Sequence, residues 1–401
     1  MNLLPDLPLT IRVGGPLDAL ERRPLRPYAE PVLSFLSALS KALLGRAEVR
    51  DHPDIAAFAF WCRPANLSRL SAELDRRHAR IGRGLVLHVA PSNVPVNFAY
   101  SFAFGLLAGN ANIVRIPDGF AQVEIICDAI AALFAMPDHA RVAAMNRLVR
   151  YPRDDAITTA LSAECQARMI WGGDATVAHL KQLPAHPRCV DVAFADRYSL
   201  CLLGAEAVLA ASEEALADLA RGFFNDSYLF DQNGCSSPHL VLWQGSAEAS
   251  AAAQRRFWPA LEPLVRDRYP LTDARAVDKF AHLCRTAGTV EAVRGAVRHD
   301  NLIYRIALDA LPVDIERHRG QSGTFFEHVA DGLEGLAHIV TERYQTVTCF
   351  GVDRQAVVDF VVERGLLGID RVVPVGKALD MGVVWDGYML VEELSRIVHS
   401  G

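Results

Sequence analysis

The sequence predicts an α/β protein built on doubly wound, mainly parallel sheets. From about residue 84 onward, short apolar runs alternate with amphipathic helical segments, and glycine, proline or asparagine stands at the junctions. This alternation is typical of parallel sheets with helices on both faces, which bind ligands at the carboxyl ends of their strands. The chain has 401 residues, enough for two domains that each bury a core of their own.

The first half carries the more regular pattern. Residues 1–80 are expected to be largely helical. Strands are expected at 84–90, 111–116, 169–171, 189–194 and 199–203. Helices should follow the first three of these strands, with Asn93 and Asp118 as N-cap residues of the first two. The third helix should begin after the turn at Gly172 and Gly173 and run to about Leu183.

The second half mixes strands and helices less regularly. Helices are expected near 212–225, 248–267, 274–285 and 388–398, and strands near 239–243, 289–297, 302–308 and 346–352. We expect a cofactor-binding domain over residues 1–200, which includes the helical N-terminal region. A catalytic domain over 201–375 should follow, and the segment 376–401 is expected to pack back on the first domain.

Composition excludes several classes of partner and site. The net charge of -6 creates no field that would attract nucleic acid or an anionic membrane surface. The eight cysteines show neither CxxC nor zinc-ligand spacing, so no metal site is expected and the thiols should be reduced. Polar residues interrupt the most apolar stretch, 94–116, and residues 1–15 lack signal-peptide features. We therefore expect a cytoplasmic protein without a membrane span.

Four motifs occur in an informative order. They are APSNVPVNF (90–98), LLAGNANIVRIP (106–117), IWGGDATVAHL (170–180) and FDQNGCSSPHLV (230–241). No GxGxxG is present, which argues against an ordinary Rossmann dinucleotide site. Together the motifs resemble the aldehyde dehydrogenase superfamily. The stretch GIDRVVPVGKALDMGVVWDGYMLVEELSRIV (368–398) and FDQNGCSS resemble more closely its acyl-CoA reductase family, typified by the fatty-acid reductase of bacterial bioluminescence.

The resemblance runs from about residue 55 to the end. It implies an aldehyde-dehydrogenase-like fold, with two Rossmann-type domains and the active site between them. Cys235 falls at the position of the nucleophile, which opens a helix in the family, so that the helix dipole would favour the thiolate. Asn93 falls at the position of an oxyanion-stabilising asparagine. The alternatives from the residues alone are a buried cysteine and a plain helix N-cap.

Further positions match cofactor-contacting residues. Arg115 replaces a lysine found near the adenosine ribose, and a guanidinium there could pair with a 2′-phosphate, which favours NADPH over NADH. Gly172, Gly173 and Asp174 match the turn that approaches the pyrophosphate. Gln345 stands where a glutamate contacts the nicotinamide ribose. Each has an alternative: a solvated charge, an ordinary turn or a surface residue.

One departure from the dehydrogenases bears on the reaction. The segment VAFADRYS (192–199) lacks the glutamate that activates water for hydrolysis of the thioester, and Asp191 and Asp196 are the carboxylates close by. An aldehyde-forming enzyme must not hydrolyse its acyl-enzyme, so this absence suits a reductase. His88 is expected to be a core histidine, and His239 a residue behind the nucleophile.

The resemblance therefore implies NADPH-dependent reduction of an acyl thioester, either acyl-CoA or acyl-protein, to an aldehyde, with NADH as a second cofactor. One alternative is a coenzyme-A-acylating aldehyde dehydrogenase that runs in the oxidative direction. Another is an acyl-relay subunit without hydride transfer. An acyl-protein synthetase or a carrier protein would be the partner. The sequence leaves the oligomeric state open, including a homo-oligomer.

Overall fold

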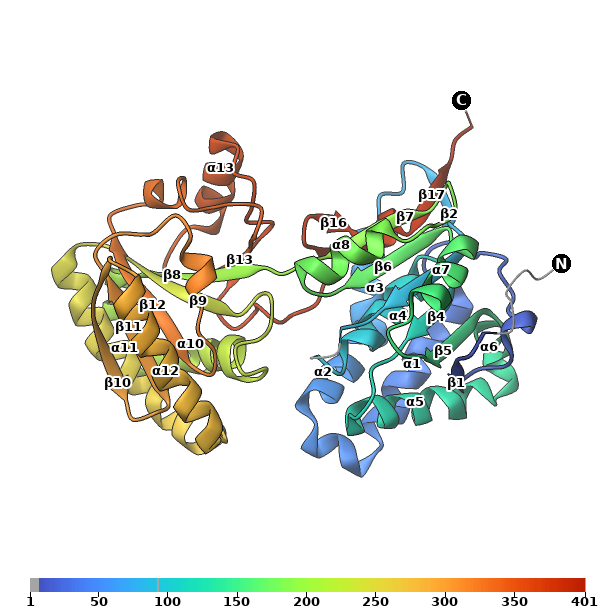
Figure 1. Cartoon of the computed structure of the whole chain (residues 1–401), viewed down its shortest axis with the longest axis horizontal. Coiled ribbons are helices and arrows are strands. Elements are labelled where there is room, and N and C mark those ends of the chain that lie inside the picture. Colours follow the sequence, from blue (N-terminus) through green and yellow to red (C-terminus); the bar gives the residue numbers. More distant parts are fainter. Residues whose placement is uncertain (1–6, 92–93, 401) are drawn as a thin grey trace. The chain divides into compact units, whose positions relative to one another are not determined.

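The computed structural model describes residues 7–91 and 94–400. The chain divides into two compact units (Figure 1): Met1–Ala195 with Met381–Gly401 form the first, and Asp196–Asp380 form the second. Each unit has a mainly parallel sheet covered by helices, which confirms the predicted fold class.

The sheet of the first unit has six strands. In spatial order they are β1 (Thr10–Val13), β5 (Asn146–Arg150), β4 (Ala111–Arg115), β3 (Leu85–Val89), β6 (Ala167–Trp171) and β7 (Val190–Phe194). Only the edge strand β1 is antiparallel to its neighbour. The chain moves outward from β3 through β4 to β5 and then returns to the other side of β3 for β6 and β7. The strand order therefore reverses between β3 and β6, and doubly wound sheets bind ligands at the carboxyl ends of the strands beside such a reversal.

Eight helices of the described residues accompany this sheet before residue 195. They are α1 (Glu30–Leu44), α2 (Pro53–Trp61), α3 (Pro64–Ala72), α4 (Asn97–Leu107), α5 (Ala121–Phe134), α6 (Ala140–Met145), α7 (Asp155–Glu164) and α8 (Asp174–Gln182). Alternate residues of β3 divide between the faces. Leu85 and Leu87 join the core that contains Leu161 of α7 and Leu180 of α8. His88 faces α4 instead.

His88 is the predicted core histidine. It is fully buried, with Nε2 2.9 Å from Asn112 Oδ1 and Nδ1 2.8 Å from Ser101 Oγ. Burial lowers the pKa of His88 to about 4, so the ring is neutral. Gly105 permits this packing, because a Cβ there would lie 2.8 Å from His88 Nε2.

The sheet of the second unit has seven strands. In spatial order they are β10 (Val293–His299), β11 (Ile303–Leu308), β12 (Thr324–Ala330), β9 (Pro238–Gln244), β8 (Tyr198–Gly204), β13 (Tyr344–Phe350) and β14 (Arg371–Pro374). Only β10 is antiparallel to its neighbour. One face packs against α9 (Ala205–Ala210), α10 (Glu213–Tyr228) and α11 (Ala247–Arg268), and the other against α12 (Asp273–Thr289) and α13 (Arg354–Arg364).

The C-terminal segment Met381–Gly401 belongs to the first unit, but its secondary structure differs from the sequence prediction. The expected helix at 388–398 is wrong. The segment forms β15 (Val384–Trp385), β16 (Tyr388–Met389), the short helix α14 (Leu390–Glu393) and β17 (Ser395–Val398), which pairs antiparallel with β2 (Ala79–Gly82). Leu390, Val391 and Leu394 are buried with helical spacing, but only one turn of helix forms. Beyond it, pairing with β2 overrides the local helical pattern.

The expected N-caps of the first unit are corrected: the N-cap of α4 is Val96 and that of α5 is Phe120, in place of Asn93 and Asp118. The Asp118 carboxylate instead pairs with Arg150 at 2.7 Å. Residues 1–80 also contain β1 and the start of β2 besides their helices. Short 3-10 helices lie at Leu17–Ala19, Ala47–Asp51, Pro137–His139, Ile315–His318 and Glu334–Leu336.

Across residues 7–91 and 94–400, no helix combines the length and apolar character needed to cross a bilayer.

Candidate functional site

Cys235 lies on a tight turn in the second unit. Ser237 donates its backbone N–H to the Gly234 carbonyl at 3.0 Å, and β9 begins at Pro238. Cys235 therefore stands at the amino-terminal edge of the sheet and does not open a helix, so the expected stabilisation by a helix dipole is wrong. The side chain is half-buried. Cys201 and Cys349 of the same unit are buried, and burial raises the pKa of Cys349 to about 12.

Gln232 fixes the chain just before this turn. Its backbone is in the left-handed region (φ +63°) and its side chain is 1% exposed. The amide Nε2 donates to the carbonyls of Pro238 (2.9 Å) and Thr324 (3.0 Å). The amide Oε1 accepts from the N–H groups of Gly323 (3.0 Å) and Thr324 (3.1 Å). One buried side chain thus satisfies four backbone groups and ties the cysteine turn to the start of β12.

Asp231 connects the chain before the cysteine turn to Tyr269, at the end of α11, and to Arg275 of α12. It also has a positive φ of 55°. Its carboxylate accepts from the Tyr269 hydroxyl at 2.7 Å and pairs with Arg275 of α12 at 2.8 Å. Its carbonyl accepts from Ser322 N–H at 3.0 Å. The two left-handed residues are therefore held by surrounding contacts, as strained residues at functional sites usually are.

Ser199 connects Cys235 to Gln345. The Ser199 hydroxyl donates to the Cys235 carbonyl at 2.7 Å and accepts from Thr346 N–H at 3.1 Å. Ser199 is at the start of β8, which lies between β9 and β13 in the sheet. Gln345, next to Thr346, is 2% exposed. The structure thus places Cys235 and Gln345 at the same edge, and Gln345 is not the surface residue of the alternative reading.

His239 lies behind the cysteine turn, on β9. It is 3% exposed and stacks on Tyr198 with ring centroids 5.4 Å apart. Burial lowers its pKa to about 3, so the ring is neutral, and its Nδ1–H donates to the Gly320 carbonyl at 3.1 Å. A neutral ring engaged in this way supports the turn and is poorly suited to accept a proton.

The two carboxylates considered as substitutes for a hydrolytic base are both paired with arginines. Asp191 of the first unit receives two hydrogen bonds from Arg168, each of 2.7 Å. Asp196 of the second unit accepts from Arg319 at 2.6 Å. A guanidinium therefore occupies oxygen lone pairs of each carboxylate that a general base would need.

In the first unit, Gly172, Gly173 and Asp174 follow β6 directly, at the carboxyl edge of the sheet. Gly173 is the N-cap of α8 and has no side chain that caps the helix. It is exposed, and a Cβ built on it would meet no atom within 4 Å. The space beside Gly173 is therefore open, and a helix N-terminus with such open space suits the approach of a phosphate.

Arg115 ends β4 at the same carboxyl edge. Its Nε donates to the Tyr151 carbonyl at 3.2 Å, and its guanidinium lies 5.0 Å from the centre of the Tyr151 ring. No carboxylate within the described part of the chain forms an ion pair with it. The hydrogen bond to Tyr151 therefore fixes Nε of Arg115. The positive charge of the guanidinium is not neutralised by an ion pair with a described carboxylate, which suits an anionic ligand. Asn93 lies outside the described residues.

The family follows from comparison with known proteins. Residues 59–397 match the sequence profile of the acyl-CoA reductase (LuxC) family. The chain belongs to this family. Members of the family are acyl-CoA reductases. The protein is therefore an oxidoreductase that acts on acyl groups or aldehydes. This confirms the predicted resemblance. A search of curated proteins finds no match.

Solved structures show that the chain has the aldehyde dehydrogenase fold. Aldehyde dehydrogenase 21 from Physcomitrella patens has a TM-score of 0.65 at 9% identity, over 92% of this chain and 85% of that chain. A salicylaldehyde dehydrogenase from Pseudomonas putida G7 gives 0.61 at 14% identity, over 92% and 85%. An NAD-dependent benzaldehyde dehydrogenase from Corynebacterium glutamicum gives 0.59 at 15% identity, over 92% and 84%. Identities this low establish the fold alone.

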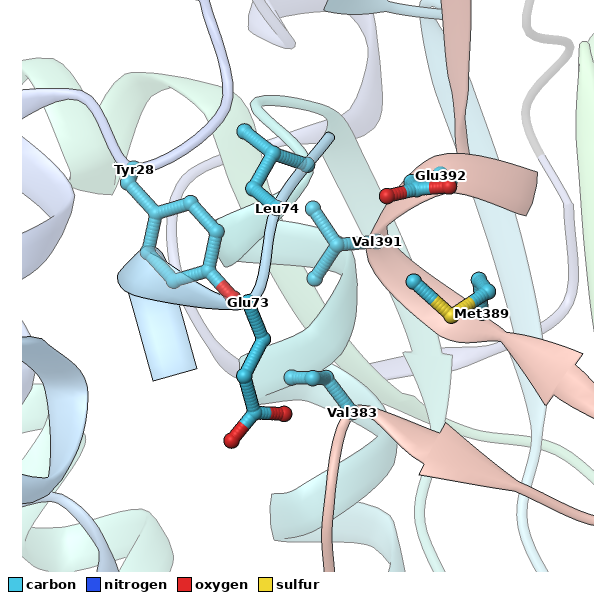
Figure 2. A pocket seen from close by; sticks show the side chains of 7 residues that line it. All are labelled: Tyr28, Glu73, Leu74, Val383, Met389, Val391 and Glu392. Carbon is cyan, nitrogen blue, oxygen red and sulfur yellow. The ribbon is translucent and has the colours of Figure 1, made fainter. Parts of the chain in front are cut away.

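A small pocket of the first unit lies apart from these candidate residues. Figure 2 shows it between the N-terminal helical region and the C-terminal segment, lined by Tyr28, Glu73, Leu74, Val383, Met389, Val391 and Glu392. None of the residues expected to bind a cofactor lines it. Among the residues that the structure describes, no group of three or more histidine, cysteine or acidic side chains could hold a metal ion.

Ser199 and Gln232, which fix the cysteine turn, were not singled out from the sequence. Neither was Asp226 of α10, although all three residues are almost completely buried. A polar residue inside an otherwise apolar strand or helix is the signal that could have found Ser199 and Asp226, because buried polar groups need specific partners.

Proposed function

We propose that the protein reduces an acyl thioester, either acyl-CoA or an acyl-protein, to an aldehyde with NADPH, through a thioester on Cys235. The observation that carries the proposal is the setting of Cys235. It is a half-buried thiol on a turn whose flanking backbone is fixed by Gln232 and Ser199, in a chain of the acyl-CoA reductase family.

The proposed chemistry begins with attack of the Cys235 thiolate on the acyl carbonyl carbon. The bond between this carbon and the thiol of the donor breaks, the donor leaves as a thiolate, and the acyl group remains on Sγ. Asn93 is proposed to stabilise the oxyanion. Bound NADPH would supply a hydride to the acyl carbon. The C–Sγ bond then breaks, which releases the aldehyde and regenerates the thiolate.

The first unit is proposed to bind the cofactor at its carboxyl edge. The open N-terminus of α8 at Gly173 fits a pyrophosphate, and Asp174 would lie beside it. The Arg115 guanidinium fits a 2′-phosphate, which supports NADPH, with NADH as the weaker cofactor. Gln345 of the second unit is proposed to contact the nicotinamide ribose.

The thioester should persist in water until hydride arrives. Asp191 and Asp196 are engaged by arginines, and general-base assistance is typically worth roughly 10²–10⁴-fold. We also propose a cytoplasmic location, which the eight free cysteines support, and an acyl-protein synthetase or carrier protein as a donor of the acyl group.

Loss of NADPH absorbance on addition of acyl-CoA of increasing chain length to the purified chain tests this function. Aldehyde should form in equal amount with NADP⁺. Acyl transfer to Cys235 without NADPH consumption would instead indicate a relay subunit. Turnover restricted to aldehyde, NADP⁺ and coenzyme A would indicate the oxidative direction. Sustained production of carboxylic acid without any thiol would indicate an ordinary aldehyde dehydrogenase.

A further inference from the structure

A segment of the second unit, Val375–Asp380, lies against the cysteine turn. A Cβ built on Gly234 would be 3.4 Å from Leu379 Cδ2, so the Leu379 side chain packs directly beside the residue that precedes Cys235. The segment follows β14 and contains the buried residue Ala378. We call Val375–Asp380 the bracing segment.

Asp226 of α10 holds this segment from one side. Its carboxylate is 1% exposed and accepts the N–H groups of Gly376 at 2.6 Å and Ala378 at 2.9 Å. Gly222, one helical turn earlier, lets the segment approach, since a Cβ there would be 3.1 Å from Gly376 Cα. Burial raises the pKa of Asp226 to about 7, and the two N–H donors oppose that rise.

Arg371 of β14 holds the segment from the other side. Its guanidinium donates to the carbonyls of Ala378 (2.6 Å), Lys377 (2.8 Å) and Asp380 (2.7 Å). Burial lowers the pKa of Arg371, and the negative charges of Asp380, the Cys235 thiolate and Asp226 oppose this shift. Its three hydrogen bonds place the guanidinium on the same segment whose Leu379 packs beside Gly234, so its positive charge lies in the surroundings of Cys235.

We infer that Arg371 and Asp226 are positioning residues for Cys235, with different contributions. Both hold the bracing segment against the cysteine turn through backbone hydrogen bonds. Arg371 also supplies the positive charge that favours the thiolate, in place of the helix terminus that the structure lacks at Cys235. The inference rests on the proposed role of Cys235 and names the group that supports its ionisation.

The charges around the segment determine what each substitution should do. They are Arg371 on β14, Asp226 on α10 and the exposed ion pair between Lys377 Nζ and Asp380 Oδ2 (2.9 Å). Removal of Arg371 deletes a positive charge, and removal of the Asp226 charge deletes a negative one. Both loosen the bracing segment, but they change the thiolate population in opposite directions.

The test is the pH dependence of Cys235 alkylation by iodoacetamide in the full chain, with the modified peptide identified by mass spectrometry. Because only the thiolate reacts, Arg371→Met should slow alkylation about tenfold at pH 7, since one pKa unit is a factor of ten. In Asp226→Asn, Cys235 should be alkylated at least as fast as in the unaltered protein. Both should lower kcat for NADPH-dependent reduction. Arg364→Met, which removes an exposed arginine of α13, should change neither quantity.

Arg371→Lys keeps the charge but cannot bridge three carbonyls. It should be alkylated within about twofold of the unaltered rate and still lose kcat. Arg371→Gln, which removes the charge but keeps amide donors, replaces the methionine variant if that variant does not fold. Alkylation of Arg371→Met at the unaltered rate, or slowing in Arg371→Lys or Asp226→Asn, would overturn the inference. The alkylation measurement needs no acyl substrate, so it remains informative even if the proposed reductase activity is absent.

Discussion

The two units present their candidate residues at opposite edges of their own sheets. In the first unit, Arg115 and Gly173 follow the carboxyl ends of β4 and β6. In the second, Cys235 and Gln345 stand at the amino ends of β9 and β13. Only the candidate residues of the first unit agree with the general rule that ligands bind at the carboxyl ends of strands.

The two edges also differ in how tightly their residues are held. The space beside Gly173 is open. The Arg115 guanidinium forms no ion pair with a carboxylate of the described residues. Around Cys235, by contrast, buried side chains of Gln232 and Ser199 fix the backbone. The first arrangement suits a ligand that arrives and leaves at each turnover. The second suits a reacting atom whose position must not change, because small displacements of a nucleophile are costly.

The largest effect should come from Cys235→Ala. Aldehyde formation should fall by at least about 10³-fold, because the acylation site is removed, while NADPH binding and thermal stability stay unchanged. NADPH consumption and cofactor titration measure the two quantities. Cys284→Ala, an exposed cysteine on α12, is the matched control and should retain full activity. An alanine variant at 235 that still forms aldehyde would disprove the covalent route.

Asn93→Ala should come next, with kcat lowered by roughly 10²–10³, the usual loss for one oxyanion donor. Asn93 is proposed to stabilise the oxyanion of the acyl group on Cys235. Steady-state kinetics and a melting curve should be measured together. A loss of stability with normal kcat would leave Asn93 with only a structural role.

Gln232→Ala tests how rigidly the second unit holds its turn. Four buried backbone groups lose their partner, so the free energy of unfolding should fall by about 3 kcal/mol, and kcat should fall with it. Affinity for NADPH should not change. Chemical denaturation gives the first quantity. If the variant were as stable and active as the original, the turn would not depend on this side chain.

Arg115→Ala tests the open edge of the first unit. Affinity for NADPH should fall roughly tenfold or more, from loss of a charge-assisted contact, whereas affinity for NADH should change little. Fluorescence titration with both cofactors measures this. Stability should be retained, in contrast to Gln232→Ala. Equal losses for the two cofactors would remove Arg115 from the 2′-phosphate.

A dependence of stability on pH, without effect on the chemistry at neutral pH, should be shared by both units. His88 and His239 have folded pKa values lowered to about 4 and about 3, so the unfolded chain binds more protons than the folded chain below pH ~6.5. Stability should therefore fall as the pH drops from 6.5 to 4, by roughly 1 kcal/mol per pH unit for each histidine. Denaturation at several pH values checks this. If the free energy of unfolding of His88→Gln fell with pH as steeply as that of the unaltered protein, His88 would not contribute to the acid sensitivity.

The sequence predicted the elements that local patterns define. The apolar runs that became β3, β4 and β8 were found, and so was the helix capped by Ser212. The strands β5, β12 and β14 were missed, because their residues alternate too little to be separated from neighbouring loops. The terminal helix was expected wrongly, since the pairing of β17 with β2 joins residues more than 300 positions apart.

The candidate site was predicted only where a motif names its residues. Cys235 was singled out by its motif and resemblance, but the helix expected to support it does not exist. The contacts that replace that helix could not be inferred locally. Asp226 accepts the Gly376 N–H across 150 positions, and Ser199 reaches the Cys235 carbonyl across 36. Such contacts appear only once the strands are ordered in the sheet.

The most direct test of the account is the mass of the enzyme after incubation with acyl-CoA in the absence of NADPH. We predict one acyl group per chain, attached to the peptide that contains Cys235, stable in buffer and released as aldehyde when NADPH is added. An unmodified Cys235, an acyl group on another residue, or its release as carboxylic acid before NADPH is added would contradict the proposed thioester reductase mechanism.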